Sequence, residues 1–228
     1  MRAVVMGGTS GIGLATAGQL TDAGIDVTVT GRDPARLAAV AGRFDGAEQV
    51  DSTDKDAVSA LFKRLGTFAH LVLAFSPGPV GFGPIREISL DDFETAFTGK
   101  LFAYIHAIRE AQVTESITMI SAASARAALP GTVALAAVNG AIERIVSPLA
   151  AELAPVRVNA VSPGIIDTPW WSFLPDDQRQ AQFAAAAGGV PAGRIGTAAD
   201  VAGAVSYLIG ASLVTASILP VDGGFTVA

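Results

Sequence analysis

The sequence predicts an α/β protein built on one doubly wound, seven-stranded parallel sheet with helices on both faces. Three observations lead to this prediction. Short apolar runs alternate with stretches of helical spacing, a glycine-rich turn joins the first strand to the first helix, and no linker, repeat or charge block interrupts the 228 residues. Such alternation is typical of parallel sheets covered by helices. Residues 1–228 are therefore expected to form a single domain.

Each element is predicted from local periodicity. Short apolar runs rich in β-formers predict buried strands, and apolar residues at helical spacing predict helices. The predicted strands span 2–6, 25–30, 48–51, 69–75, 116–121, 156–161 and 217–221. The predicted helices span 11–23, 34–42, 54–65, 89–112, 132–153, 175–187 and 197–210. We expect the strands to lie in the order 3-2-1-4-5-6-7.

Composition narrows the classes of function. Half of the residues are hydrophobic, the net charge is −6 and there is no basic run, so nucleic acids and membranes are not expected as partners. The absence of cysteine excludes disulfides and thiolate metal sites, and His70 and His106 lack the spacing of metal ligands, so no metal is expected. No apolar run reaches membrane-spanning length and no signal peptide precedes the first strand, so a cytoplasmic protein is expected.

The turn after the first strand carries the strongest functional signal. Seven residues, Gly7 to Gly13, follow the apolar run Ala3–Met6 and open a helix. A tight turn at this point needs residues without Cβ, and free N–H groups at a helix N-terminus favour an anion. A strand at 25–30 completes a βαβ unit, which favours dinucleotide binding over a glycine turn without ligand. The predicted contacts are Gly7, Thr9, Ser10, Gly11, Ile12 and Gly13.

The end of the second strand favours NADP(H) over NAD(H). An acid there would bind the ribose hydroxyls of NAD, whereas this strand ends in Arg32, which pairs well with a phosphate. The alternative is a solvated surface arginine. Because ligands of such sheets bind at the carboxyl ends of the strands, further cofactor contacts are expected at the ends of strands three and four. These are Asp51 and Ser52, which could instead cap a helix, and Ala74, Phe75 and Ser76.

Motifs spread over the whole chain resemble those of the short-chain dehydrogenase/reductase family. They are the GxxxGxG turn of residues 7–13, the segment 157–164, Asp167-Thr168-Pro169, the segments 193–196 and 200–202, and residues 221–224. The resemblance implies a Rossmann-type fold, a nicotinamide cofactor, a small-molecule substrate and a homo-oligomer, either a tetramer or a dimer. It places Pro163, Gly164, Ile166 and Thr168 against the nicotinamide carboxamide. The sequence departs from the family pattern at Met6 and at residues 73–76.

The resemblance breaks down at the catalytic positions. The family usually reduces a carbonyl with an asparagine, a serine, a tyrosine and a lysine. Counting from matched neighbours places these positions at Lys100, Ala122, Leu135 and Asn139, respectively. Leucine cannot donate a proton, so the usual mechanism is not expected. Relative to the family pattern, lysine and asparagine have exchanged places: Lys100 stands where the asparagine is usual, and Asn139 where the lysine is usual.

Three interpretations remain open. In the first, an iminium accepts a hydride without a proton, and Asp167 supplies a carboxylate near the reacting centre or merely caps a helix. Arg126 would then orient Asp167 or bind a substrate acid. The chain resembles divergent fungal relatives that couple iminium reduction to a cycloaddition, so a non-redox cyclase or isomerase on this fold is a further alternative.

In the second interpretation, substitutes supply the acid–base chemistry. A buried Lys100 with a depressed pKa would act as the acid, Asn139 would pack beside it, and Ser121 or Ser124 would orient a polar substrate atom. Tyr104 shares the helix face of Lys100 but is the kind of residue that usually packs in a core. In the third interpretation, the chain is not an enzyme and binds NADP(H) as a sensor or as an inactive subunit.

Residues 169–196 are expected to form an apolar lid. The segment includes Trp170, Trp171, Phe173 and Phe183, and the family resemblance places it over the substrate. Apolar lids exclude water and suit hydrophobic ligands, although some of these side chains could instead pack in a subunit interface. The predicted function is NADP(H)-dependent hydride transfer to a small, apolar carbonyl or imine. The candidate catalytic residues are Lys100, Ser121, Asn139 and Asp167.

Overall fold

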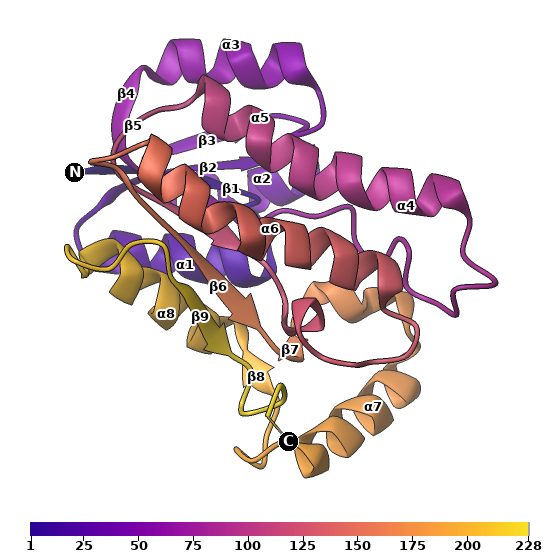
Figure 1. Ribbon diagram of the computed structural model, residues 1–228. Coiled ribbons are helices and arrows are strands. Elements are labelled where there is room, and N and C mark those ends of the chain that lie inside the picture. The colour runs from indigo at the N-terminus through magenta and orange to yellow at the C-terminus, as the bar shows by residue number, and fades with distance from the viewer. Residues whose placement is uncertain (228) are drawn as a thin grey trace.

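A computed structural model, which describes residues 1–227, contains the predicted seven-stranded parallel sheet (Figure 1). The order β3-β2-β1-β4-β5-β6-β9 confirms the predicted topology. The strands are β1 (Arg2–Met6), β2 (Asp26–Gly31), β3 (Gly46–Gln49), β4 (Thr67–Leu73), β5 (Gln112–Ile120), β6 (Arg157–Pro163) and β9 (Ile218–Val221). The central strand β1 is covered on both faces, since Ala3, Val4, Val5 and Met6 are fully buried. This explains why the sequence there is continuously apolar rather than alternating.

Helices form a layer on each side of the sheet (Figure 1). They are α1 (Gly11–Asp22), α2 (Pro34–Val40), α3 (Lys55–Leu65), α4 (Leu90–Ala96), α5 (Ala103–Glu110), α6 (Val133–Glu152), α7 (Asp176–Gly189) and α8 (Ala198–Gly210). One hydrophobic core joins α3, α5 and α6 to the sheet, and a second core on the opposite face joins α1 and α8 to it. These layers leave the carboxyl ends of the strands open for ligands.

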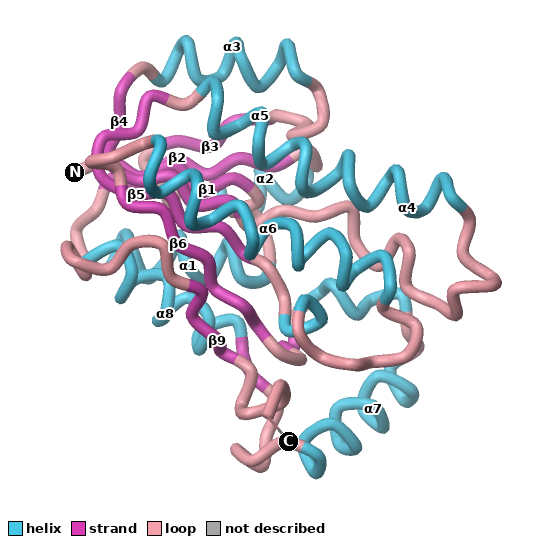
Figure 2. Tube along the Cα trace, viewed as in Figure 1, coloured by secondary structure: helices cyan, strands magenta, loops and turns pink. Residues whose placement is uncertain are grey.

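The structure differs from the predicted elements at several points, and Figure 2 shows where its helices and strands lie. The helix predicted over 89–112 is divided, because α4 and α5 are joined by a π-helical turn, Phe97–Phe102, which contains Lys100. The third strand pairs at Gly46–Gln49, two residues earlier than predicted. Two short strands, β7 (Ile166–Asp167) and β8 (Gly196–Thr197), form a separate pair. Pairs of this length are too short to show a periodicity in the sequence.

Helix α6 corrects the expectation that no apolar segment is long enough to span a membrane. Its length and composition alone would allow it to span one. In its most apolar stretch of 18 residues, 33% of the residues are buried inside the protein. The buried residues Ala134, Val138, Ile142 and Val146 recur every fourth position. This spacing lays one apolar stripe against the sheet, as expected for a core helix of an α/β domain.

Candidate active site

A cavity of about 620 Å³ opens at the carboxyl ends of the strands. It is lined by segments that are distant in the sequence, from the turn after β1 to the segment after β6. All of the predicted cofactor contacts line it except Gly13, which is buried beneath the turn. Of the predicted catalytic residues, Lys100, Ser121 and Asn139 line the cavity and Asp167 does not. The fold therefore brings together most of the residues that the sequence singled out.

The turn after β1 is shaped to bring its backbone close to a ligand. Gly7 has a φ of +81°, and the N–H groups of Gly7 and Gly8 both donate to the carbonyl oxygen of Thr30. A Cβ on Gly13 would overlap the carbonyl oxygen of Gly7. Ser10 precedes α1 without a capping bond from its side chain, so the first N–H groups of this helix are left for an anion. This cradle fits the pyrophosphate of a dinucleotide.

Two arginines lie at the end of this cavity that is nearest to β2. Arg32 and Arg36 both line it, and the Arg36 Nη1 lies 3.4 Å from the Ser10 Oγ. Arg36 also lies 3.6 Å from an Asp33 carboxylate oxygen. Hydrogen bonds from Thr53 lower the pKa of Asp51, and the charge of Arg32 lowers it further. The sequence analysis did not single out Arg36, although its place in the first turn of the helix that follows Arg32 is a signal for it.

Lys100 extends from the π-helical turn into the interior. The side chain is buried and lines the cavity. Its Nζ donates to the Asn139 Oδ1 at 2.6 Å and to the Ser121 carbonyl oxygen at 3.4 Å. Burial lowers the pKa of the ammonium group to about 7, although the negative charge of Glu143 acts in the opposite direction. At neutral pH the amine is therefore close to half-protonated, the state that suits proton transfer.

Asn139 fixes the position of this amine. While its Oδ1 accepts from Lys100, its Nδ2 donates to the Leu135 carbonyl oxygen at 2.8 Å and to the Ser124 Oγ at 3.2 Å. The Ser124 hydroxyl, which also lines the cavity, thus accepts one bond and keeps its own hydrogen to donate. The exchange of lysine and asparagine between two helices is accommodated by a direct hydrogen bond between them.

Glu143, which the sequence analysis did not single out, contacts Ser121 of the cavity lining without lining the cavity itself. Its Oε1 accepts from the Ser121 hydroxyl at 2.9 Å and from the Ser162 hydroxyl at 2.7 Å, and its Oε2 lies 3.4 Å from the Arg126 Nε. The Ser121 hydroxyl is therefore directed toward Glu143 and is not free to orient a substrate. Since Glu143 follows Asn139 by four residues, both lie on one face of α6. That spacing is the signal that could have identified it.

The structure does not support catalytic roles for three other side chains. Asp167 is exposed on β7, outside the cavity, and Arg126 pairs with Glu143 instead of Asp167. The Tyr104 hydroxyl donates to the carbonyl oxygens of Phe75 and Ile120 at 3.1 and 3.3 Å, and burial raises the pKa of this phenol. A phenol held in this way is a poor proton donor. Lys100 is therefore the acid best placed in the cavity.

Aromatic side chains close the outer part of the cavity. The rings of Phe82 and Trp170, both in the lining, meet edge to face at 6.5 Å, and Trp170 meets Trp171 at 4.8 Å. Trp171 is anchored because its indole N–H donates to the Ile166 carbonyl oxygen at 3.0 Å. Phe183 of α7 packs against Trp171 from the other side. This arrangement fits an apolar substrate.

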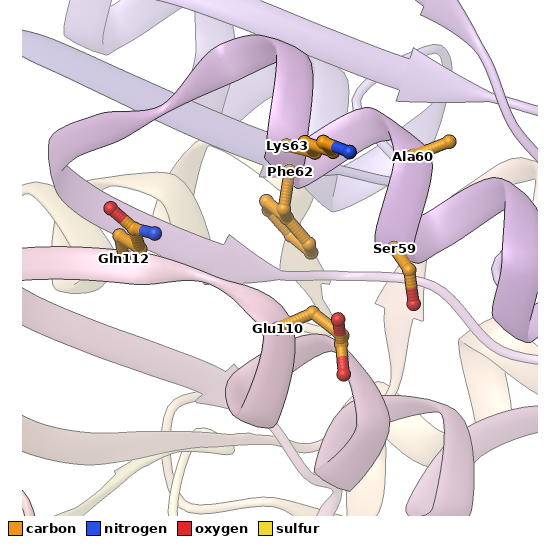
Figure 3. A pocket seen from close by; sticks show the side chains of 6 residues that line it. All are labelled: Ser59, Ala60, Phe62, Lys63, Glu110 and Gln112. Atoms are coloured by element: carbon orange, nitrogen blue, oxygen red, sulfur yellow. The ribbon is translucent and has the colours of Figure 1, made fainter.

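A second, smaller depression of about 350 Å³ lies at the opposite edge of the sheet (Figure 3). It is lined by Ser59, Ala60, Phe62, Lys63, Glu110 and Gln112. In Figure 3, Phe62 lies between the Lys63 and Glu110 side chains. Because Glu110 ends α5 and Gln112 begins β5, this depression is at the amino ends of the strands, away from the ligand-binding edge.

Comparisons with known proteins agree with this geometry. A family described as "Enoyl-(Acyl carrier protein) reductase" matches residues 7–226. Cis-4-hydroxycyclohexanecarboxylate dehydrogenase of Sinomonas cyclohexanicum is 32% identical, over 98% of this chain and 96% of that protein. The crystal structure of a small-chain dehydrogenase in complex with NADPH has a TM-score of 0.87 and 32% identity, and the match covers 100% and 99% of the two chains.

These matches define an oxidoreductase of the nicotinamide type, and the chain belongs to the short-chain dehydrogenase/reductase family. The fold alone is also shared with the MalC Reductase/Diels-Alderase from Malbranchea aurantiaca, at a TM-score of 0.90 and 23% identity, with 99% and 96% of the two chains covered.

Proposed function

We propose that this protein is an NADP(H)-dependent reductase of small, apolar carbonyl or imine substrates, in which Lys100 donates the proton. The observation that carries the proposal is the Lys100 amine, which is buried on the cavity wall with a pKa of about 7. The lysine would replace the tyrosine, whose expected position is taken by Leu135. The similarity to a dehydrogenase over nearly the whole chain supports the reaction class.

The residues around the cavity would hold the cofactor in three places. The N–H groups of residues 9–13 would bind the pyrophosphate, Arg32 and Arg36 the 2′-phosphate, and the segment 163–168 the nicotinamide. A similar solved structure contains NADPH, which supports this assignment. When bound, the reduced nicotinamide supplies a hydride to the substrate.

The side chains of the site would manage the proton and the orientation. An ammonium carries three N–H donors, of which Lys100 directs one to Asn139 and one to the Ser121 carbonyl. The third would protonate the substrate oxygen or nitrogen, while the Ser124 hydroxyl orients that atom. Asp167 lies outside the cavity, and the carboxylates of the described residues that line it, Asp33 and Asp51, belong to its cofactor end. None of the carboxylates in the lining therefore lies where it would offset a cationic substrate beside the nicotinamide. A neutral carbonyl or imine therefore fits better than an iminium.

The test is calorimetric titration with NADPH, followed by NADPH oxidation with apolar ketones, quinones and cyclic imines. We expect tight binding and turnover of apolar ketones or neutral imines. Binding without any turnover would support the alternative of a non-catalytic NADP(H)-binding sensor or inactive subunit. The absence of NADPH binding would contradict the proposal as a whole.

Replacement of Arg32 by alanine is expected to weaken NADPH binding by about tenfold to 100-fold and to leave NADH binding nearly unchanged. The guanidinium would lose its charge-assisted bonds to the 2′-phosphate, which NADH lacks. Dissociation constants of both nucleotides, measured by calorimetry on the variant and on the parent protein, check this. Equal losses for the two nucleotides would remove the phosphate role of Arg32.

Replacement of Glu143 by glutamine is expected to move the pH dependence of turnover to lower pH. The negative charge of Glu143 raises the pKa of Lys100, so removal of this charge lowers that pKa further. The pH range in which the Lys100 amine is protonated then ends at a lower pH. The amide oxygen can still accept from Ser121 and Ser162. The measurement is kcat against pH for one ketone, and a shift toward higher pH would contradict the assigned interaction.

We also propose a cytoplasmic homo-oligomer, most simply a tetramer. Exposed apolar side chains on two surfaces support it: Phe102 and Ile105 on the α5 side, and Tyr207 and Leu213 on the α8 side, of which Leu213 is 95% exposed. Two separate apolar surfaces on one chain are what a tetramer with two kinds of interface requires.

A further inference from the structure

The surroundings of Lys100 are those of a nucleophilic amine as well as those of an acid. Both hydrogen-bond acceptors of the Nζ are neutral: an amide oxygen at 2.6 Å and a backbone carbonyl oxygen at 3.4 Å. Within residues 1–227, no carboxylate lies within ion-pair distance of it, and the carboxylate of Glu143 is shared between two hydroxyls and Arg126. The contacts of the amine therefore include no ion pair, and a neutral amine can donate its two N–H groups to the same two oxygens and turn its lone pair to the cavity.

The cavity that Lys100 lines has apolar walls beyond the polar contacts of the amine, and it is open to solvent. Lys100 shares the cavity with Leu135, Val138, Leu129 and Phe82, and none of these can trap a carbonyl compound by a competing reaction. A desolvated lysine in an apolar pocket is the usual setting in which proteins form Schiff bases.

We propose that Lys100 also acts as a nucleophile, condensing with apolar aldehydes or ketones to form an imine on the protein. This activity differs from proton donation and requires no cofactor. The neutral amine adds to the carbonyl carbon: an N–C bond forms, the C=O π bond opens, and one proton passes from the nitrogen to the oxygen. The resulting carbinolamine loses its hydroxyl as water with a proton taken from solvent, and the nitrogen returns its remaining proton to solvent, so that a neutral C=N bond is left. No oxidant or reductant is consumed.

The lysine content of the chain makes the proposal simple to test. There are three lysines, Lys55, Lys63 and Lys100, and the first two are exposed on α3. An ordinary exposed lysine is neutral in only about one molecule in 2,500 at neutral pH, given its usual pKa. Lys100, with a pKa of about 7, is neutral in about half. The two exposed lysines therefore serve as internal controls for the buried one.

The experiment treats the full chain, without nucleotide, with benzaldehyde and sodium cyanoborohydride at neutral pH. Any imine is thereby reduced to a stable benzylamine. Intact mass spectrometry counts the adducts and peptide mapping locates them. We expect benzyl groups on Lys100 and on the N-terminal amine, whose ordinary pKa is about 8, with Lys100 labelled at least 100-fold faster than Lys55 or Lys63. The same reaction in concentrated urea is expected to lose this preference, because unfolding restores the ordinary pKa.

Lys100→Arg is the matched variant, since it keeps the positive charge but cannot form an imine with benzaldehyde. It is expected to show no adduct at this position. Labelling confined to Lys55, Lys63 and the N-terminal amine, or no labelling at all, would overturn the proposal. The comparison among lysines within the parent protein decides the matter even if the variant fails to fold. A failure here would leave the reductase proposal standing, because that proposal is tested by NADPH oxidation.

Discussion

Substitution of Lys100 by methionine is expected to lower kcat for ketone reduction by about 100-fold to 1,000-fold, the usual contribution of a positioned general acid. Methionine keeps most of the apolar stem and removes the amine that donates to Asn139. The Tyr104 hydroxyl cannot take over, because it is bound to two backbone carbonyls. Steady-state NADPH oxidation measures the effect, and NADPH binding by calorimetry should change little. A variant with near-normal kcat would show that Lys100 is not the proton donor.

The same substitution is expected to change how the free energy of unfolding depends on pH. This effect distinguishes the loss of a buried amine from a general folding defect. The folded-state pKa of Lys100 lies below its unfolded value, so the unfolded chain binds more protons between about pH 7 and the ordinary lysine pKa of about 10.4. The parent protein therefore gains stability as pH rises through this range, and the Lys100→Met variant lacks that gain. Thermal unfolding at several pH values checks the sign. A stability difference that does not depend on pH would contradict the depressed pKa.

Substitution of Gly13 by alanine is the second change with a large expected effect. The added Cβ would overlap the carbonyl oxygen of Gly7, which is backbone and cannot swing away. Overpacking of this kind costs about 1–3 kcal/mol, and the turn that carries the anion-binding N–H groups would shift. A loss of about 3 kcal/mol in binding corresponds to a roughly 100-fold weaker affinity for NADPH. Calorimetry with NADPH and thermal unfolding together measure the two consequences.

Gly18 provides the control in the same helix. A Cβ at this position meets no atom within 4 Å, so Gly18→Ala is expected to stabilise α1 by about 0.5–1 kcal/mol and to leave NADPH binding unchanged. If both glycine variants weakened binding equally, the effect would not arise from the turn. If neither did, the turn would not be the pyrophosphate site.

The sequence was sufficient to predict the sheet and its strand order. Continuous apolar runs such as Ala3–Met6 are produced by strands that are buried on both faces, and the glycine turn marks the point where β1 passes into α1. Boundaries were less accurate where tertiary contacts decide them. The π-helical turn that holds Lys100 has no separate signal, because its residues continue the helical periodicity on both sides.

The site was predictable only in part, for a related reason. Strand ends collect at one edge of a parallel sheet, so the cavity lining followed from the topology. Contacts between side chains did not follow from it. The sequence placed Lys100 and Asn139 at exchanged positions, but only the structure shows the 2.6 Å hydrogen bond between them. Similarly, Asp167 is adjacent in sequence to cavity residues, yet it is exposed outside the cavity, on the short strand β7 that pairs with β8.

The central claim is that Lys100 supplies the proton in an NADP(H)-dependent reduction, and the pH dependence of kcat/KM for an apolar ketone tests it most directly, because this parameter reports the acid before the substrate binds. With saturating NADPH, kcat/KM is expected to be constant below about pH 7 and to fall about tenfold per pH unit above it, as the Lys100 ammonium loses its proton. A profile that stays flat, or that rises from about pH 6 to about pH 9, would contradict the claim.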